Sequence, residues 1–262
     1  MTSPILVTGG TGTLGQHVVP RLRAAGREVR VLTRSEREGS EGVEYVVGDL
    51  LRGTGIEAAV DGVGTVLHLA GGPKGDDRAT EALVRAGASA GIEHLVLISV
   101  IASDRIPLGY FRAKAGAERA VVESGIPYSI LRAAQFHDLT LKVAEKMGAM
   151  PVVPAPGGLR WQPVDSREVA SRLVELTLGS PAGRAADLAG PEVQTLVELT
   201  RGLLAARGKR RPFLPVRIPG KAGRAYRAGA NLNLATAARG NRTWEEFLAE
   251  RYPRPSPDPG RV

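Results

Sequence analysis

One segment restricts the fold of this chain more than any other: ILVTGGTGTLGQHVV, at residues 5–19. Its glycines at positions 9, 12 and 15 lie between a β-rich run and a helical pattern. In such a unit the first glycine permits a tight turn, the second lets a diphosphate approach the backbone, and the third lets the helix pack closely. Because N–H groups at a helix start attract phosphates, the segment predicts a dinucleotide site, although a glycine-rich turn without a ligand has the same spacing. The expected phosphate-binding residues are Gly9, Thr11, Gly12, Thr13, Leu14 and Gly15.

Short runs of Val, Ile and Leu alternate with longer helical patterns through the first half of the chain. This alternation is typical of a parallel sheet with crossover helices. The expected strands are residues 5–8, 28–33, 43–47, 63–68, 94–99 and 127–131. The expected helices are residues 14–25, 76–90, 109–124, 165–178, 195–207 and 243–251. The predicted fold class is therefore α/β, a Rossmann-type doubly wound parallel sheet.

The alternation weakens after about residue 133, where prolines and a glycine pair interrupt the pattern. We therefore expect a nucleotide-binding domain over residues 1–150 and a small substrate-binding lobe over residues 151–252, packed on the same sheet. The last segment, PRPSPDPGRV at 253–262, has four prolines and little apolar content, which predicts a flexible tail.

Composition excludes several classes of site. The chain has no cysteine and only four histidines, so disulfides and thiolate sites are excluded and no metal site is expected. No apolar run approaches the roughly 20 residues that span a bilayer, so we expect no membrane association and a cytoplasmic protein. Residues 201–262 contain 14 Lys and Arg against 4 Asp and Glu. Without interleaved aromatic residues this basic surface favours a solvated face, or an anionic small molecule, over nucleic acid.

The end of the second expected strand indicates which cofactor binds. An acid there hydrogen-bonds the ribose 2′-hydroxyl of NAD, whereas an arginine accepts the 2′-phosphate of NADP. The sequence VRVLTRSER places Thr33 and Arg34 at this point. NADP(H) is therefore expected in preference to NAD(H), although Glu36 or Glu38 facing the ribose would permit NAD(H).

With these residues the sequence resembles the short-chain dehydrogenase/reductase superfamily, in its atypical branch of NmrA-like, NAD(P)H-binding proteins. The resemblance extends over roughly residues 4–250 and is strongest in the first half. It is carried by TGGTGTLG at 8–15, Arg34, GDL at 48–50, HLAG at 68–71, YFRAK at 110–114, SGIPYSILRAAQF at 124–136 and AGPE at 189–192.

The resemblance implies further positions around the cofactor and the substrate. It implies that Asp49 and Leu50 border the adenine, unless Asp49 only caps the following loop. Arg132 would border the nicotinamide, or else form a structural ion pair. The segment Leu69, Ala70 and Gly71 would line the cofactor, and the candidate substrate residues are Gln135, Phe136 and Trp161, of which Trp161 is equally suited to a buried anchor.

Tyr110 and Lys114 match the Y-x-x-x-K acid/base pair of the superfamily. Residues four apart share a helix face, so the Lys114 ammonium is expected near the phenol, where it favours phenolate and also holds the nicotinamide ribose. The superfamily places a hydroxyl shortly after the fifth strand. Here Ser99 is the candidate and Ser103 the alternative, because Val100 and Ile101 stand where many relatives have it.

Three functions are compatible with these residues. The first is an NADPH-dependent oxidoreductase that reduces a ketone, quinone or similar conjugated small molecule, with Tyr110 as proton donor and Lys114 assisting. The second is a regulator that senses NADP without turnover, and the third is an isomerase or epimerase. The expected partner is a small-molecule substrate, and the protein is expected to be a monomer or a homodimer.

Overall fold

A computed structural model of the protein describes residues 3–253. Among these residues nine strands form one sheet, with the order β13-β10-β6-β5-β4-β1-β2-β3 and β9 beside β6. All the pairs are parallel. The first six strands are β1 (Ile5–Thr8), β2 (Val29–Thr33), β3 (Val43–Val47), β4 (Thr65–His68), β5 (His94–Val100) and β6 (Tyr128–Ala133). The chain runs outward from β1 to β3 and then crosses back to β4, so the strand order reverses between β1 and β4. The predicted Rossmann-type fold is confirmed.

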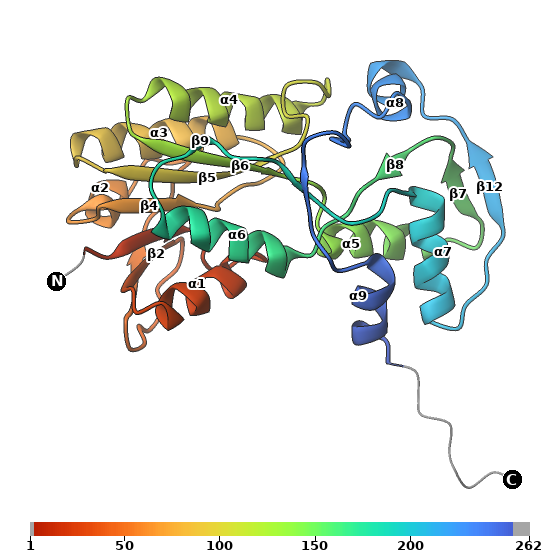
Figure 1. The fold of residues 1–262 in the computed structure, drawn as a ribbon, viewed down its shortest axis with the longest axis horizontal. Helices are drawn as coiled ribbons and strands as arrows, with labels where there is room; N and C mark the ends of the chain where they lie inside the picture. The colour runs from red at the N-terminus through yellow and green to blue at the C-terminus, as the bar shows by residue number, and fades with distance from the viewer. Residues whose placement is uncertain (1–2, 254–262) are drawn as a thin grey trace, which may run out of the picture.

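Helices cover both faces of the sheet (Figure 1). One face carries α2 (Ile56–Val60), α3 (Asp76–Ser89) and α4 (Gly109–Glu123), and the other carries α1 (Gly15–Ala24) and α6 (Ser166–Leu178). Two apolar clusters result, because successive side chains of a strand point to opposite faces. In β5, Val96 and Ile98 belong to the α1 and α6 side, whereas Leu95 and Leu97 belong to the α2, α3 and α4 side.

The second half builds an additional lobe, seen on the right in Figure 1. Its core joins α5 (His137–Gly148), α7 (Leu196–Ala206) and α9 (Trp244–Arg251) through buried Leu141, Leu203 and Trp244. Around this core lie β7 (Val153–Pro156) paired with β12 (Phe213–Val216), β8 (Arg160–Trp161) paired with β11 (Gln194–Thr195), and α8 (Gly220–Arg227). The short helices α2 and α8 and the 12-residue α5 were not expected from the sequence.

The lobe and the sheet are interleaved along the chain. Helix α5 lies before residue 150 yet packs against α7, whereas α6, β9 (Gly183–Arg184), β10 (Leu188–Ala189) and β13 (Ala238–Arg239) lie after it and return to the sheet. The division of the chain into domains at residue 150 stays a prediction. Residues 254–262 of the expected tail lie outside the described residues. Within residues 3–253, no helix is both long and apolar enough to cross a bilayer.

Candidate functional site

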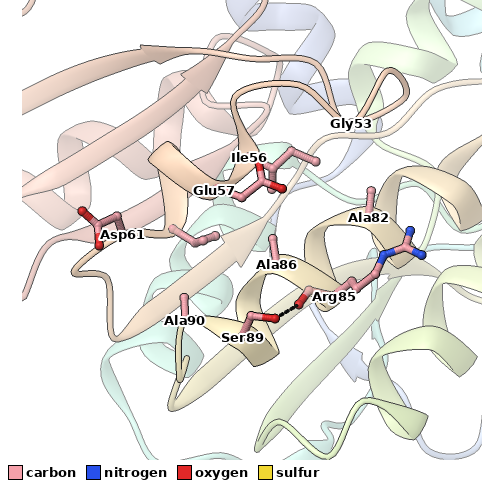
Figure 2. A pocket seen from close by; sticks show the side chains of 10 residues that line it. Gly53, Ile56, Glu57, Asp61, Ala82, Arg85, Ala86, Ser89 and Ala90 are labelled. Carbon is pink, nitrogen blue, oxygen red and sulfur yellow. Dashed lines mark hydrogen bonds between the residues drawn. The ribbon is translucent and has the colours of Figure 1, made fainter.

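Two hollows border α3, and their positions in the fold distinguish them. The first lies between α2 and the carboxyl-terminal half of α3, where Ile56 of α2 and Ala86 and Arg85 of α3 are among the residues that line it (Figure 2). This hollow is away from the carboxyl ends of the strands, which is where open α/β sheets bind ligands.

The second hollow is a cavity of about 750 Å³ at the carboxyl ends of β1, β2 and β4, where the strand order reverses. Ligand cavities commonly have this size and this position. Eleven of the predicted cofactor residues line it: Gly9, Thr11, Gly12, Thr13, Leu14, Arg34, Asp49, Leu50, Leu69, Ala70 and Gly71. Gly15, Lys114 and Arg132 are not among its lining residues, and of the three predicted substrate residues only Phe136 is.

The glycine turn forms one wall of this cavity through close backbone contacts. Gly9 has a φ of +70°, and a Cβ there would lie 2.6 Å from the Ala70 nitrogen. A Cβ on Gly15 would lie 2.2 Å from the Gly10 carbonyl, so this glycine lets α1 pack against the turn. At Gly12 a Cβ would lie 3.3 Å from the Gly9 oxygen, a tight contact, and Gly12 itself lines the cavity.

The start of α1 supplies positive potential to the same wall. Within the described residues no side chain caps this helix and no acid lies in its first turn. The partial positive charge at the helix start is therefore not neutralised by the protein itself. Together with the Gly12 backbone, which lines the cavity, this arrangement fits the diphosphate of a dinucleotide.

The side chains at the ends of β2 and β3 differ in charge. Arg34, Ser35 and Arg37 line the cavity, whereas Glu36 and Glu38 are not among its lining residues. Two cations and a hydroxyl at this point suit a 2′-phosphate. Asp49 also lines the cavity, but its Oδ1 accepts backbone hydrogen bonds from Leu51 at 2.8 Å and from Arg52. Asp49 therefore does cap its loop, which is the alternative that the sequence left open.

Lys114 is paired with an acid that the sequence analysis did not single out. Its Nζ lies 2.9 Å from Oδ2 of Asp76, and the two side chains are only 9% and 5% exposed. Asp76 begins α3, lines the cavity, and its Oδ1 accepts a hydrogen bond from the Gly72 backbone at 2.7 Å. The ammonium is thus held just behind the cavity wall instead of projecting into it.

Tyr110 is the second residue of α4, the helix that also carries Lys114, and its side chain is 39% exposed. The pKa of its phenol is raised to about 12, mainly by burial and in smaller part by the charges of Asp76 and Tyr226. The pKa is thus raised and not lowered as expected, because burial dominates and the carboxylate of Asp76, which lies against the Lys114 ammonium, acts in the same direction. Tyr110 is consequently a protonated phenol at neutral pH.

The two candidate serines both donate hydrogen bonds to Glu118. Ser99 Oγ lies 2.5 Å and Ser103 Oγ 2.8 Å from Oε1 of this buried carboxylate. Arg132 binds the same carboxylate through Nε at 2.9 Å and Nη2 at 2.7 Å, so it forms the structural ion pair considered as its alternative role. Burial alone would raise the pKa of Glu118, but hydrogen bonds from Arg132 and the two serines outweigh it and hold that pKa below its usual value.

Sequence spacing offered one signal for Glu118. Tyr110, Lys114 and Glu118 follow each other at intervals of four, so all three lie along one side of α4. Asp76 gave a weaker signal, as the first helical residue after a glycine-rich loop. Its partner lies 38 positions along the chain, a contact that no local pattern indicates.

The remaining substrate candidates lie around the start of α5. Phe136 immediately precedes the helix and faces the cavity. Gln135 is buried, and Trp161 packs between the two apolar clusters of the lobe, as an anchoring residue does. Below them, Asp138 accepts a hydrogen bond from Ser166, and Asp165 caps α6.

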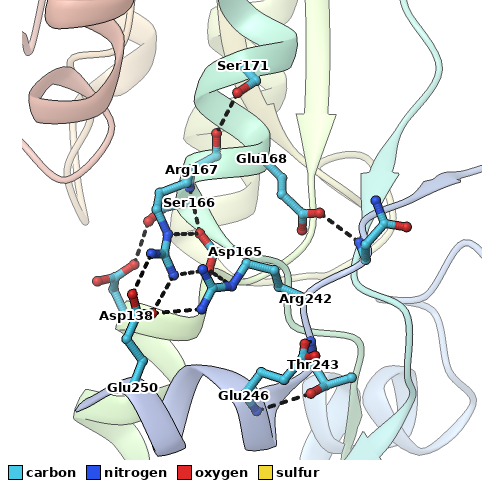
Figure 3. Close-up of polar contacts among 11 residues, drawn as sticks. Asp138, Asp165, Ser166, Arg167, Glu168, Ser171, Arg242, Thr243, Glu246 and Glu250 are labelled. Atoms are coloured by element: carbon cyan, nitrogen blue, oxygen red, sulfur yellow. Dashed lines mark hydrogen bonds and ion pairs between the residues drawn. The ribbon is translucent and has the colours of Figure 1, made fainter.

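An ion network fastens this end of α6 to α9 (Figure 3). Arg167 bonds Asp165 at 2.7 Å and Glu250 at 2.9 Å, and Arg242 also reaches both acids. Arg242 precedes α9 in the chain and Arg167 lies in the first turn of α6. The network therefore joins the sheet side of the molecule to its lobe.

Comparisons with known proteins agree with this geometry. The NAD(P)H-binding family matches residues 9–176. The chain is 34% identical over 212 residues to the (4-alkanoyl-5-oxo-2,5-dihydrofuran-3-yl)methyl phosphate reductase of Streptomyces griseus, a match covering 78% of this chain and 74% of that protein. It is 28% identical to an NAD(P)H azoreductase of Xenophilus azovorans, with the same two coverages. The NADPH-dependent quinone oxidoreductase of Escherichia coli, solved with NADPH, has the same fold, with a TM-score of 0.79 at 18% identity over 95% of this chain and 99% of that one.

Proposed function

The chain belongs to the NAD(P)H-binding family and is an NAD(P)H-dependent oxidoreductase, and from this premise we propose that it uses NADPH to reduce a conjugated carbonyl compound. The observation that carries the proposal is the cavity at the strand reversal, with the glycine turn at one end and Tyr110 on the helix behind the other. Two relatives at 34% and 28% identity are reductases of conjugated molecules, a butenolide phosphate and azo compounds.

The chain's own residues orient the cofactor. The Gly12 turn and the start of α1 would hold the diphosphate, and Arg34 and Arg37 would hold the 2′-phosphate. NADPH supplies the hydride when it is bound. Phe136, which lines the cavity on the lobe side, would exclude water from the acceptor.

Tyr110 supplies the proton that balances the hydride. Hydride arrival at the far carbon of a conjugated acceptor moves the electron pair of the double bond toward the carbonyl oxygen, and a phenol with a raised pKa remains protonated to meet that charge. The proton leaves Tyr110 Oη, and solvent restores it after product formation. The net reaction adds one hydride and one proton to the acceptor.

The engagement of both serines favours a conjugated acceptor over a simple ketone. Ser99 and Ser103 donate to Glu118, so neither hydroxyl proton is directed at a substrate oxygen. A simple ketone concentrates the developing charge on one oxygen and needs several donors there, whereas conjugation spreads that charge over the acceptor.

A specific observation also favours an acceptor that carries an anionic group. Lys221 and Arg224 are exposed on α8, the helix whose Tyr226 contributes to the raised pKa of Tyr110. We propose that a phosphate or carboxylate on the acceptor would extend past Tyr226 to one of these cations, at the solvent side of α8. The printed substrate of the Streptomyces relative is a phosphate ester.

The test is NADPH oxidation with a butenolide phosphate, its dephosphorylated form, a quinone and a simple ketone. We expect turnover of the conjugated acceptors, with the phosphate ester preferred and the simple ketone poorest. Tyr110→Phe should lower kcat about 100-fold while NADPH binding, followed by nicotinamide fluorescence, stays unchanged. Tyr128→Phe serves as the matched control, because Tyr128 is the first residue of β6, at the end of the sheet opposite to the cavity. NADPH binding with no turnover of any acceptor would instead support the sensor hypothesis.

A further inference from the structure

The buried pair of Asp76 and Lys114 has a geometry that ordinary packing does not require. Two charges have been removed from water at the end of α3, which costs free energy unless both are well compensated. The carboxylate is compensated twice, by the ammonium at 2.9 Å from Oδ2 and by the Gly72 N–H at 2.7 Å from Oδ1. The pair therefore fixes the ammonium relative to the backbone that lines the cavity.

The ammonium lies directly behind Gly71. A Cβ on this residue would come within 2.9 Å of Lys114 Nζ and 3.1 Å of Asp76 Oδ2. Gly71 itself lines the cavity. Because Gly71 has no side chain, only its backbone separates the ammonium from a ligand in the cavity.

A chain of hydrogen bonds fixes the other end of Asp76. Its carbonyl oxygen accepts from Thr80 Oγ1 at 2.7 Å, and that hydroxyl meets His68 Nε2 at 3.0 Å. His68 Nδ1 meets Thr8 Oγ1 at 2.6 Å, and Thr8 accepts from the Ala70 N–H. These partners require a neutral imidazole protonated at Nε2. Asp76 is thereby tied to both β1 and β4, on either side of the strand reversal.

We propose that Asp76 is a positioning residue that holds the Lys114 ammonium against the Gly71 wall, where it can meet the ribose hydroxyls of the bound cofactor. The inference deepens the proposed function and rests on it. Asp76 acts through Lys114 and transfers no proton itself. Loss of the carboxylate would leave the ammonium free to turn toward Tyr110.

Every element packed around the pair contributes to its charge balance. Helix α3 supplies Asp76, α4 supplies Lys114 and Tyr110, α8 supplies Tyr226, and β4 supplies His68. Burial lowers the pKa of His68 to about 3, and the Lys114 charge acts in the same direction, so this imidazole adds no cation at neutral pH. Asp76 is thus the group that offsets the ammonium.

The first experiment compares Asp76→Asn with the matched control Asp77→Asn, the same change one position along the same helix. Asp76→Asn should lower kcat/KM for NADPH about 10-fold to 100-fold, because the ammonium is misplaced. Asp77→Asn should change it less than about twofold, and Asp76→Glu should recover part of the loss. Equal effects of the Asn substitutions at 76 and 77 would overturn the proposal.

A double-mutant cycle with Lys114→Met separates positioning from general destabilisation. If Asp76 acts through Lys114, adding Asp76→Asn to Lys114→Met causes no further loss of kcat/KM. A multiplicative loss in the double variant would contradict the proposal. Because Lys114→Met alone leaves a buried unpaired carboxylate, circular dichroism of each variant checks that the chain is folded.

A readout without turnover distinguishes failure of this inference from failure of the proposed function. Tyrosinate absorbance against pH, with Tyr110→Phe subtracted, follows the ionisation of Tyr110 in the free protein. In Asp76→Asn this ionisation should move to lower pH, because the variant loses an anion and frees a cation. An unchanged titration would refute the inference whether or not any acceptor is reduced, whereas a shifted titration without turnover would refute only the proposed function.

Discussion

The sheet side of the molecule and the lobe of α5, α7, α8 and α9 form their surfaces in different ways. On the sheet side, the glycine turn approaches its neighbours so closely that Cβ atoms added at Gly9, Gly10 and Gly15 would lie 2.2 to 2.8 Å from other atoms. In the lobe, the segment before α8 exposes Leu214, Val216 and Ile218 together with Arg217. The difference teaches that cofactor binding here depends on backbone geometry, which tolerates little change, whereas acceptor recognition depends on side chains that can be exchanged.

The largest expected effect tests whether the backbone of the glycine turn tolerates as little change as its contacts indicate. Gly15→Ala places a Cβ 2.2 Å from the Gly10 backbone, so we expect a loss of more than about 3 kcal/mol in the free energy of unfolding. Gly157→Ala in the lobe meets nothing within 4 Å and should change stability by less than about 0.5 kcal/mol. Urea denaturation measures both. Similar values for the two variants would show that the glycine turn is not as tightly packed as its contacts indicate.

The next effect compares a buried histidine from each region. Burial lowers the pKa of His68, on the sheet side, to about 3, and that of His137, in the lobe, to about 4. Both imidazoles protonate near pH 6.5 when unfolded, so the unfolded state binds more protons below that pH. The contribution of the two neutral imidazoles to the free energy of unfolding is therefore fully present above about pH 6.5. It falls as the pH drops toward 4, by up to about 1.4 kcal/mol per pH unit for each histidine.

His137→Phe sharpens this comparison, because the ring packs against Trp244 and Phe247 and its nitrogens have no hydrogen-bond partner among the described residues. In this variant the pH dependence of the free energy of unfolding should keep the part due to His68 and lose the part due to His137. Urea denaturation at several values between pH 7 and pH 4.5 gives the slopes. An unchanged slope in His137→Phe would mean that the ring takes up its proton in the folded lobe without penalty.

The smallest expected effect separates recognition of the cofactor from recognition of the acceptor. Arg34→Ala should raise the Kd for NADPH about 10-fold to 100-fold and leave that for NADH nearly unchanged, because a charged hydrogen bond to the 2′-phosphate is lost. Arg224→Ala should raise only the KM of an anionic acceptor, by a few-fold. Fluorescence titration and steady-state rates measure the two. If both substitutions raised the Kd for NADPH, the distinction between a region that binds the cofactor and one that binds the acceptor would be lost.

Much of the sheet was predictable because local patterns determine it. Strands β1 and β3 have the bounds that the apolar runs predicted, and α3 and α4 each differ by a single residue at the carboxyl end. The two-residue strands β9, β10 and β13 carry no pattern of their own and exist only because β6 and its neighbours offer free edges. Helix α5 was overlooked although buried Leu141, Ala144 and Met147 repeat at helical spacing.

The candidate site was predictable to a different extent. Glycine spacing and the arginine after β2 located the cavity, because both are features of one short segment. The direction of the Tyr110 pKa shift was not predictable, because it depends on burial by tertiary packing and, in smaller part, on Asp76 from another helix. The orientation of Ser99 was equally hidden, since it is decided by Glu118, 19 positions later.

The interleaved path of the chain limits how this protein can be engineered. Because the polypeptide leaves the sheet after β6, returns for α6 and β10, and returns again for β13, no single linker connects the lobe to the rest. A chimera that exchanges acceptor preference with a homologue by one crossover would split α5 from its partners α7 and α9. Transplanting the short stretch from β12 through α8 would leave those contacts intact, so it is the natural unit of recombination.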